Sequence, residues 1–415
     1  MGLTALQTEG PLAAELDRSR ESKRGHFAAM LLLLPIAMEG ILQLLTVSLA
    51  PVAVVLTGTR PEAVPRWLDD AELVYRPNPA HPDHDDWGFR NEQVPERADI
   101  VVLGDSQTYG AGVLRSEAWP KQLAAVSDKT VYSISCGGHG PTQSLMLLDK
   151  ALELEPDWVV EAVYAGNDLF DCYHLVHGMG GLPDLATRDE QARAEIAAAE
   201  ARETLLGQVT RVSGAASTGL KGWLRDHSRL YGLARATRDA LRGPVDGTDW
   251  PSMVAAAARS GGRDEAFQLS AEIRTTFTPA YRLCALDQSD PRLLEGRRIM
   301  EECLRRMQAR VEQAGARFVV LLVPTKELVF REVVRQSGYG SETFRRVTNN
   351  ELTFWDALRK SLQARGIAHV DALPALRAQV QQSLAPYPMS NDGHPNPVGH
   401  RAIAECVLEV AGGHE

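Results

Sequence analysis

The chain has 415 residues, of which 44% are hydrophobic and 24% are charged, so it has the composition of a globular protein with one large or two smaller domains. Its formal net charge of -10 and the lack of a basic run interleaved with aromatic residues argue against a nucleic-acid-binding protein. The five cysteines form no C-x-x-C pair, so they indicate neither a zinc site nor a thioredoxin-like motif, and their odd number leaves at least one unpaired.

Residues 27–56 are predicted to form a transmembrane anchor. They read "FAAMLLLLPIAMEGILQLLTVSLAPVAVVL", and about 20 such residues suffice to cross a bilayer. Four basic residues precede this segment: Arg18, Arg20, Lys23 and Arg24. The positive-inside tendency therefore places residues 1–26 in the cytoplasm and predicts a single-pass protein of the cell membrane whose remaining chain is extracytoplasmic.

Two features of the predicted anchor leave alternatives open. Ser48 and Ala50 satisfy the small-residue rule of signal peptidase, so cleavage is the alternative to a retained anchor. Glu39 is costly within a membrane span, so it indicates either a helix contact in the membrane or a position near one interface.

Residues 57–98 are predicted to be a linker or a loop packed over the following domain. The stretch "RPNPAHPDHDDWGFRNEQVPER" is rich in Pro, Asp and His and lacks periodicity. His81 and His84 stand beside aspartates without a regular ligand spacing, so we expect a solvated acidic loop and no metal site.

Strands and helices alternate after this linker. The first part, residues 99–173, is predicted to contain strands 99–103, 130–135 and 158–164, a helix 117–126 capped by Ser116, and a helix 142–154. Residues 174–290 are rich in Ala and Arg and are predicted to be a helical insertion. In the second part, residues 291–415, we expect helices 292–313 and 341–365, strands 317–323 and 367–370, and a last helix after Pro397. The alternation predicts an α/β fold, a parallel sheet with helices on both faces.

Four motifs place chemically useful residues at the ends of predicted strands or near the C-terminus. Ser106 lies in "IVVLGDSQTYGAG", Gly138 in "SISCGGHGPTQS" and Asn167 in "YAGND", each directly after a strand. His394 lies in "NDGHPNPVGHRAIAE" before the last helix. Since ligands bind at the carboxyl ends of parallel strands, the first three residues are expected at one edge of the sheet.

These four motifs, in this order, resemble the blocks of the SGNH hydrolases, also called the GDSL esterase-lipase family. The resemblance covers roughly residues 99–171 and 292–411. It implies a flavodoxin-like three-layer sandwich with a parallel five-stranded sheet. It also implies that Ser106 is the nucleophile and His394 the base, with an oxyanion hole formed by the amides of Ser106, Gly138 and Asn167, and no cofactor.

The chemistry requires these residue types for reasons that are independent of the family. A serine hydroxyl becomes a good nucleophile when an imidazole accepts its proton, and imidazole has an unperturbed pKa close to working pH. The oxyanion that develops on the substrate needs fixed hydrogen-bond donors. We therefore expect acyl transfer through an acyl-serine.

One position departs from the family pattern. The usual block is D-x-x-H, but Asn391 stands three residues before His394 and Asp392 stands two before it. Related polysaccharide acetyltransferases use D-x-H, so Asp392 is the candidate that orients His394. Of the other polar candidates, His139 is expected on a surface loop and His400 packed or solvated. Two aspartates are expected to fix loops, Asp105 and Asp168.

Together these observations predict a membrane-anchored, extracytoplasmic serine esterase whose substrate is an acylated carbohydrate or lipid. An O-acetyltransferase of an envelope polysaccharide is the alternative with the same intermediate. A carbohydrate-binding or assembly protein without activity is the alternative from another class, although a binding role does not require all four residues. Envelope-assembly proteins are expected partners, and neither nucleic acid nor a cofactor is expected.

Overall fold

The computed structural model describes residues 33–45, 64–213, 224, 227–241 and 249–411. The chain forms two compact units, and each is described by itself. The smaller unit combines Met1–Ala63 with Ser217–Val245, and the larger combines Val64–Ala216 with Asp246–Glu415. All residues of the four motifs lie in the larger unit.

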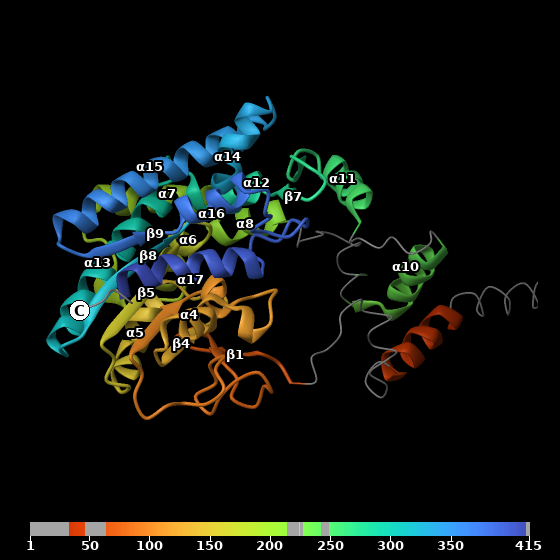
Figure 1. Ribbon diagram of the computed structural model, residues 1–415. Coiled ribbons are helices and arrows are strands. Elements are labelled where there is room, and N and C mark those ends of the chain that lie inside the picture. Colours follow the sequence, from red (N-terminus) through yellow and green to blue (C-terminus); the bar gives the residue numbers. More distant parts are fainter. Residues whose placement is uncertain (1–32, 46–63, 214–223, 225–226, 242–248, 412–415) are drawn as a thin grey trace, which may run out of the picture. The chain divides into compact units, whose positions relative to one another are not determined.

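The larger unit is built on a five-stranded parallel sheet (Figure 1). The strands are β3 (Ile100–Gly104), β4 (Val131–Ser135), β5 (Trp158–Tyr164), β8 (Arg317–Val323) and β9 (Ala368–Asp371). Their spatial order is β4-β3-β5-β8-β9, so the chain reverses its direction of winding between β3 and β5. In such sheets the crevice at the reversal is where ligands bind, and Ser106 and Asn167 follow these two strands.

Helices cover both faces of this sheet. On one face α4 (Trp119–Ser127) packs against α17 (Pro397–Ala411), and on the other face α5 (Pro141–Leu152) packs against α13 (Pro291–Gln313). Because parallel crossovers are right-handed, the reversal between β3 and β5 places these two pairs on opposite faces. The central strands are buried on both sides, so their side chains are almost all apolar and form one core with the helices. The predicted α/β architecture with a parallel five-stranded sheet is confirmed.

Several further helices belong to the larger unit. They are α3 (Ser106–Tyr109), α6 (Asp168–Tyr173), α12 (Pro279–Leu286), α14 (Lys326–Gln336), α15 (Glu342–Ala364) and α16 (Leu373–Gln381). The side chain of Ser341 caps α15 by accepting from the amide of Phe344. This cap explains why the predicted helix 341–365 begins where it does.

The region predicted as a helical insertion is not helical throughout. It holds a π-helical turn (His174–Gly178), α7 (Glu190–Arg202), α8 (Leu205–Ser213), α11 (Trp250–Arg259) and α12. It also holds an unpredicted antiparallel hairpin of β6 (Glu265–Gln268) and β7 (Arg274–Phe277). The hairpin is anchored by Phe267 and Phe277, which are buried and stack on each other.

The described part of the predicted linker packs on the sheet. It begins with a hairpin of β1 (Trp67–Asp70) and β2 (Val74–Pro77). Asn91 then bonds the backbone of Ser133 through both its amide nitrogen and its oxygen, at 3.0 Å each, and Asp85 accepts from the Tyr132 hydroxyl at 2.7 Å. Asp85 is buried, so the expectation of a fully solvated acidic loop is wrong. Within the residues that the structure describes, no group of three His, Cys, Asp or Glu side chains could hold a metal ion.

In the smaller unit, residues 33–45 are helical. Glu39 on this helix accepts hydrogen bonds from the amides of Arg229 at 2.6 Å and Leu230 at 2.9 Å, so it caps the start of α10 (Arg229–Leu241). No helix in the described ranges is both long and apolar enough to cross a membrane. The other parts of the predicted anchor, residues 27–32 and 46–56, lie outside the described residues.

Candidate active site

Ser106 stands at the junction between β3 and α3. Gly104 ends the strand with φ of +153°, and a Cβ at this position would lie 2.4 Å from Oγ1 of Thr108, so only glycine fits the turn. Asp105 caps α3 by accepting from the amide of Gln107 at 2.8 Å. The buried strand and this cap fix the backbone of Ser106 at the carboxyl edge of the sheet.

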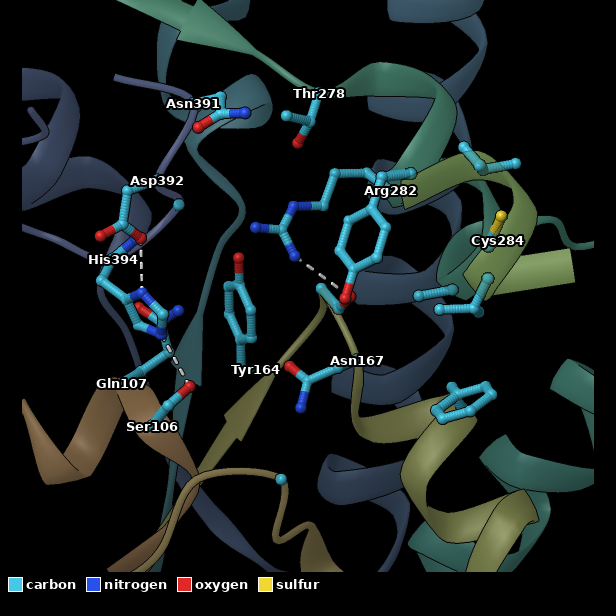
Figure 2. A pocket seen from close by; sticks show the side chains of 18 of the residues that line it. Ser106, Gln107, Tyr164, Asn167, Thr278, Arg282, Cys284, Asn391, Asp392 and His394 are labelled. Atoms are coloured by element: carbon cyan, nitrogen blue, oxygen red, sulfur yellow. Dashed lines mark hydrogen bonds and ion pairs between the residues drawn. The ribbon is translucent and has the colours of Figure 1, made fainter. Parts of the chain in front are cut away.

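His394 and Asp392 form a hydrogen-bonded chain with Ser106 (Figure 2). Nε2 of His394 lies 2.8 Å from Oγ of Ser106, and its Nδ1 lies 2.6 Å from Oδ1 of Asp392. Since a carboxylate only accepts, Nδ1 carries the proton and Nε2 is free to accept the proton of Ser106. The structure thus brings together the three residues predicted as nucleophile, base and orienting acid in the geometry of a triad.

Asp392 remains ionised beside His394. Burial acts to raise the pKa of Asp392, but the hydrogen bonds from the ring and the amide of His394 and the nearby charge of Lys326 outweigh burial and hold that pKa below its ordinary value. A second hydrogen bond, from the amide of His394 to Oδ1 of Asp392 at 3.0 Å, closes the short loop. Asn391 is exposed, and its amide contacts the carboxyl group of Asp264 instead.

Lys326 holds the loop that carries Asp392 and His394. Its side chain is 1% exposed, and its ammonium donates to the carbonyl oxygens of Ser390 at 2.9 Å and Asp392 at 2.8 Å. Burial lowers the pKa of Lys326 to about 8, although the neighbouring Glu327 opposes this shift. Lys326 was not among the predicted site residues, because nothing near it in the sequence indicates that it reaches a loop more than 60 residues away.

Gly138 and Asn167 lie at the same cavity as Ser106 and His394, as predicted for oxyanion-hole donors. Gly138 has φ of +77° in the turn between β4 and α5, a conformation that suits glycine. Nδ2 of Asn167 donates to Oδ2 of Asp171 at 2.5 Å. This bond uses one of the two amide hydrogens and fixes the other in place.

Four carboxyl groups form a cluster near Asn167: three are buried, Asp105, Glu161 and Asp168, and Asp171 is partly buried. Burial raises the pKa of Asp105 to about 6, and it raises those of Glu161 and Asp171 to about 8. Burial also raises the pKa of Asp168 well above its ordinary value. Near neutral pH Glu161, Asp168 and Asp171 are therefore largely protonated, whereas Asp105 is mostly ionised, so three of the four carboxyl groups do not oppose a negative charge that develops beside Asn167.

The site opens into a cavity of about 510 Å³. Arg282 on α12 is buried in its wall and donates to the carbonyl oxygen of Gly166 at 3.4 Å. A Cβ on Gly393 would collide with this guanidinium, so the loop before His394 needs glycine there. Sequence reasoning missed Arg282, although its position as the one charged residue in "PAYRLCAL" was a signal for a buried polar role.

The remaining candidates have structural partners. His139 is buried, so the expected surface position is wrong, and its Nε2 contacts the carbonyl oxygen of Tyr75 at 2.8 Å. Burial lowers the pKa of His139 to about 4.

His400 is packed, and its Nδ1 accepts from the amide of Trp119 at 3.3 Å. Asp168 fixes the turn after β5 by accepting from the amide of Tyr164. All five cysteines are unpaired and buried.

One known protein family matches the part of the chain that carries Asp392 and His394. Residues 289–412 match the family described as "SGNH hydrolase-like domain, acetyltransferase AlgX", and the matched range includes Asp392 and His394 but not Ser106. No curated protein matches the chain.

Solved structures that resemble the chain include an acetylxylan esterase from Geobacillus stearothermophilus, at 11% identity over 78% of this chain and 97% of that one. An extracellular lipase from Streptomyces rimosus resembles it at 15% identity over 75% of this chain and 98% of that one. Both have TM-scores of 0.35. The family match, together with the four motifs, confirms the resemblance that the sequence predicted: the chain contains an SGNH hydrolase-like domain.

Proposed function

We propose that the protein is a serine esterase that removes acyl or acetyl groups from a carbohydrate or lipid through an acyl-Ser106 intermediate. The observation that carries this proposal is the hydrogen-bonded chain from Ser106 through His394 to Asp392 at the mouth of a cavity. Chains of this kind activate a hydroxyl group that is otherwise a weak nucleophile. The SGNH hydrolase-like domain supports the same class of chemistry.

The proposed reaction has two steps, the acylation and the deacylation of Ser106. Oγ of Ser106 attacks the ester carbonyl carbon while its proton passes to Nε2 of His394, and the resulting oxyanion is held by the amides of Ser106, Gly138 and Asn167. The bond to the leaving alcohol then breaks, and His394 gives that alcohol the proton. In the second step His394 takes a proton from water as its oxygen attacks the acyl carbon. The bond between the acyl carbon and Oγ then breaks, His394 returns the proton to Oγ, and a carboxylic acid and free Ser106 are released.

An O-acetyltransferase is the second candidate, and one observation favours it. The family that matches residues 289–412 is described as acetyltransferase-related. The first step is the same for a transferase, but in the second step a sugar hydroxyl replaces water and the product is a new ester. The choice between the two depends on which acceptor reaches acyl-Ser106.

Incubating the purified full-length protein with p-nitrophenyl acetate, with and without a polysaccharide acceptor, tests the proposal. An esterase releases p-nitrophenol and acetate at a rate independent of the polysaccharide. A transferase releases p-nitrophenol faster with the acceptor and acetylates it. In either case the matched variant Ser106→Ala should be inactive, and wild-type release no faster than this variant would contradict acyl-transfer activity and favour a binding or assembly protein.

We further propose that the protein is anchored in the cell membrane with its SGNH domain outside the cytoplasm, where acylated envelope carbohydrates or lipids and assembly proteins are available. The apolar segment 27–56 and the four basic residues before it support this topology. Protease added to intact spheroplasts should digest the chain after Leu56. Full protection of that region, with digestion after lysis, would reverse the topology.

A further inference from the structure

We propose that the cavity beside Ser106 has two functionally distinct ends, and that the end away from His394 binds an acyl chain longer than acetyl. This inference rests on the proposed acyl-Ser106 chemistry and adds a substrate class to it, namely esters of short to medium-length fatty acids. The apolar end is defined by four residues: Phe170, Val209, Val212 and Cys284. The polar end is defined by Arg263, Asp264, Asn391 and Asp392.

The geometry of the triad decides which part of an ester each end receives. The tetrahedral carbon carries Oγ of Ser106, the oxyanion, the leaving oxygen and the acyl chain. The oxyanion is directed to the donors at Gly138 and Asn167, and the leaving oxygen must face His394 because that ring protonates it. The acyl chain is the substituent that remains, so it extends away from His394.

Figure 2 shows the two sides of the cavity. Asn391, Asp392 and His394 lie on one side, Cys284 lies on the opposite side, and Arg282 and Asn167 lie between them. The leaving alcohol thus meets side chains that hydrogen-bond hydroxyl groups. The acyl chain runs past Asn167 toward the apolar end.

The apolar end is built by three helices. Val209 and Val212 follow the buried Leu205 on α8 at spacings of four and three residues, so all three lie on one face of that helix. This helix packs on α12, which supplies Cys284, and α6 supplies Phe170. Burial raises the pKa of the Cys284 thiol to about 11, so this group is uncharged and packs as a small apolar side chain.

The size of the cavity exceeds what acetyl transfer requires. A volume of about 510 Å³ accommodates a chain of several carbons beside an alcohol. Burial of each methylene group contributes roughly a fourfold preference when its surface leaves water. From acetate to butyrate two methylenes are added, so kcat/KM should rise about tenfold or more.

The experiment compares p-nitrophenyl acetate, butyrate and octanoate as substrates of the purified full-length protein. A bulky side chain at the apolar end, in Val209→Trp, should lower the butyrate-to-acetate ratio of kcat/KM at least tenfold. The matched control is Leu206→Trp, because Leu206 lies on the same helix but is 52% exposed and does not line the cavity. Val212→Trp repeats the test at a second position, and thermal unfolding of each variant reports whether it folds.

The outcomes separate this inference from the function on which it rests. A ratio that falls in Val209→Trp or Val212→Trp and is unchanged in Leu206→Trp supports an acyl-chain site. Hydrolysis of acetate that requires Ser106, with no preference for butyrate or octanoate, overturns the acyl-chain site and leaves the proposed function standing. An equal ratio in all folded variants overturns the acyl-chain site in the same way. Absence of hydrolysis of any ester above the Ser106→Ala background overturns both.

Discussion

The carboxylate of Asp392 lies 2.6 Å from Nδ1 of His394, although only Gly393 separates the two residues in the chain. The same carboxylate oxygen also accepts a hydrogen bond from the backbone amide of His394. Asp392 therefore fixes both the imidazole ring of His394 and the loop that carries the two residues. A carboxylate two positions before the histidine can therefore occupy the orienting position. Asn391, three positions before the histidine, is exposed and contacts Asp264.

We expect Asp392→Asn to lower kcat far more than Asn391→Ala does. A carboxylate favours the imidazolium that forms when Ser106 attacks, whereas an amide offers only a hydrogen bond. In a reference triad such a change costs about 10⁴-fold in kcat, and a more solvated triad loses less. Parallel kinetics of the two variants on p-nitrophenyl acetate measure this difference. Near-normal turnover in Asp392→Asn would mean that His394 functions without this carboxylate.

Asn167→Ala should lower kcat by roughly 10²-fold or more with little change in KM. An oxyanion-hole donor meets its full charge only in the transition state, so its removal affects the chemical step more than substrate binding. Steady-state kinetics on the same ester provide the two constants, and a fluorophosphonate probe reports whether Ser106 is still reactive. A loss confined to KM would assign Asn167 a role in binding.

The fold was predictable where burial dictates the residue pattern. Strands 158–164 and 317–323 were placed at their observed bounds, because strands buried on both faces are continuous apolar runs between turn residues.

The predicted cap at Ser116 is wrong. Ser116 lies in a 3-10 turn, and α4 begins at Trp119, with Pro120 in its first turn. The hairpin β6–β7 was missed because its four-residue strands are too short to show a period.

Of the residues in the site, only those that lie in a recognisable local motif were predictable from the sequence. Ser106, Asn167 and His394 each lie in a short segment whose chemistry is visible in the sequence. Lys326 and Arg282 act through backbone carbonyls that are distant in sequence, 64 residues away for Ser390 and 116 for Gly166. The lone charge in the apolar stretch "PAYRLCAL" indicates that Arg282 has a buried polar role, but no local pattern indicates which distant carbonyl either residue contacts.

Glu161→Gln should make the free energy of unfolding depend less steeply on pH between about pH 5 and pH 8. Burial raises the pKa of Glu161 to about 8 in the folded protein, whereas an unfolded glutamate loses its proton near pH 4.3. In this interval the folded state holds a proton that the unfolded state lacks, so the free energy of unfolding falls as pH rises. A glutamine side chain cannot titrate, so the substitution removes this contribution.

Thermal unfolding of wild type and Glu161→Gln at pH 5, 6.5 and 8 tests this expectation. The melting temperature should fall less in the variant than in wild type over this range, although Asp171 contributes a decrease of the same sign in both. The other titratable groups are the same in both proteins, so their contributions cancel when the two pH slopes of the melting temperature are compared. Equal slopes in the two proteins would mean that Glu161 is ionised in the folded state at neutral pH.

Lys326→Met should lower kcat roughly 10²-fold, because it releases the loop on which Asp392 and His394 stand. The methionine side chain fills a similar volume without the charge, so the change removes the two hydrogen bonds to Ser390 and Asp392 with little loss of packing. Lys360→Met on the exposed surface of α15 is the matched control.

A purely structural role for Lys326 would lower the melting temperature and leave turnover per folded molecule intact. A positioning role lowers kcat with little change in KM, and it slows the labelling of Ser106 by a fluorophosphonate in the same proportion, because both reactions require His394 at 2.8 Å from Oγ. Titrating the labelled fraction gives the concentration of folded sites, so the two roles can be separated in one preparation. Wild-type kcat in a folded Lys326→Met protein would show that the remaining contacts of the loop, including the amide of His394 to Asp392, hold the triad without the lysine.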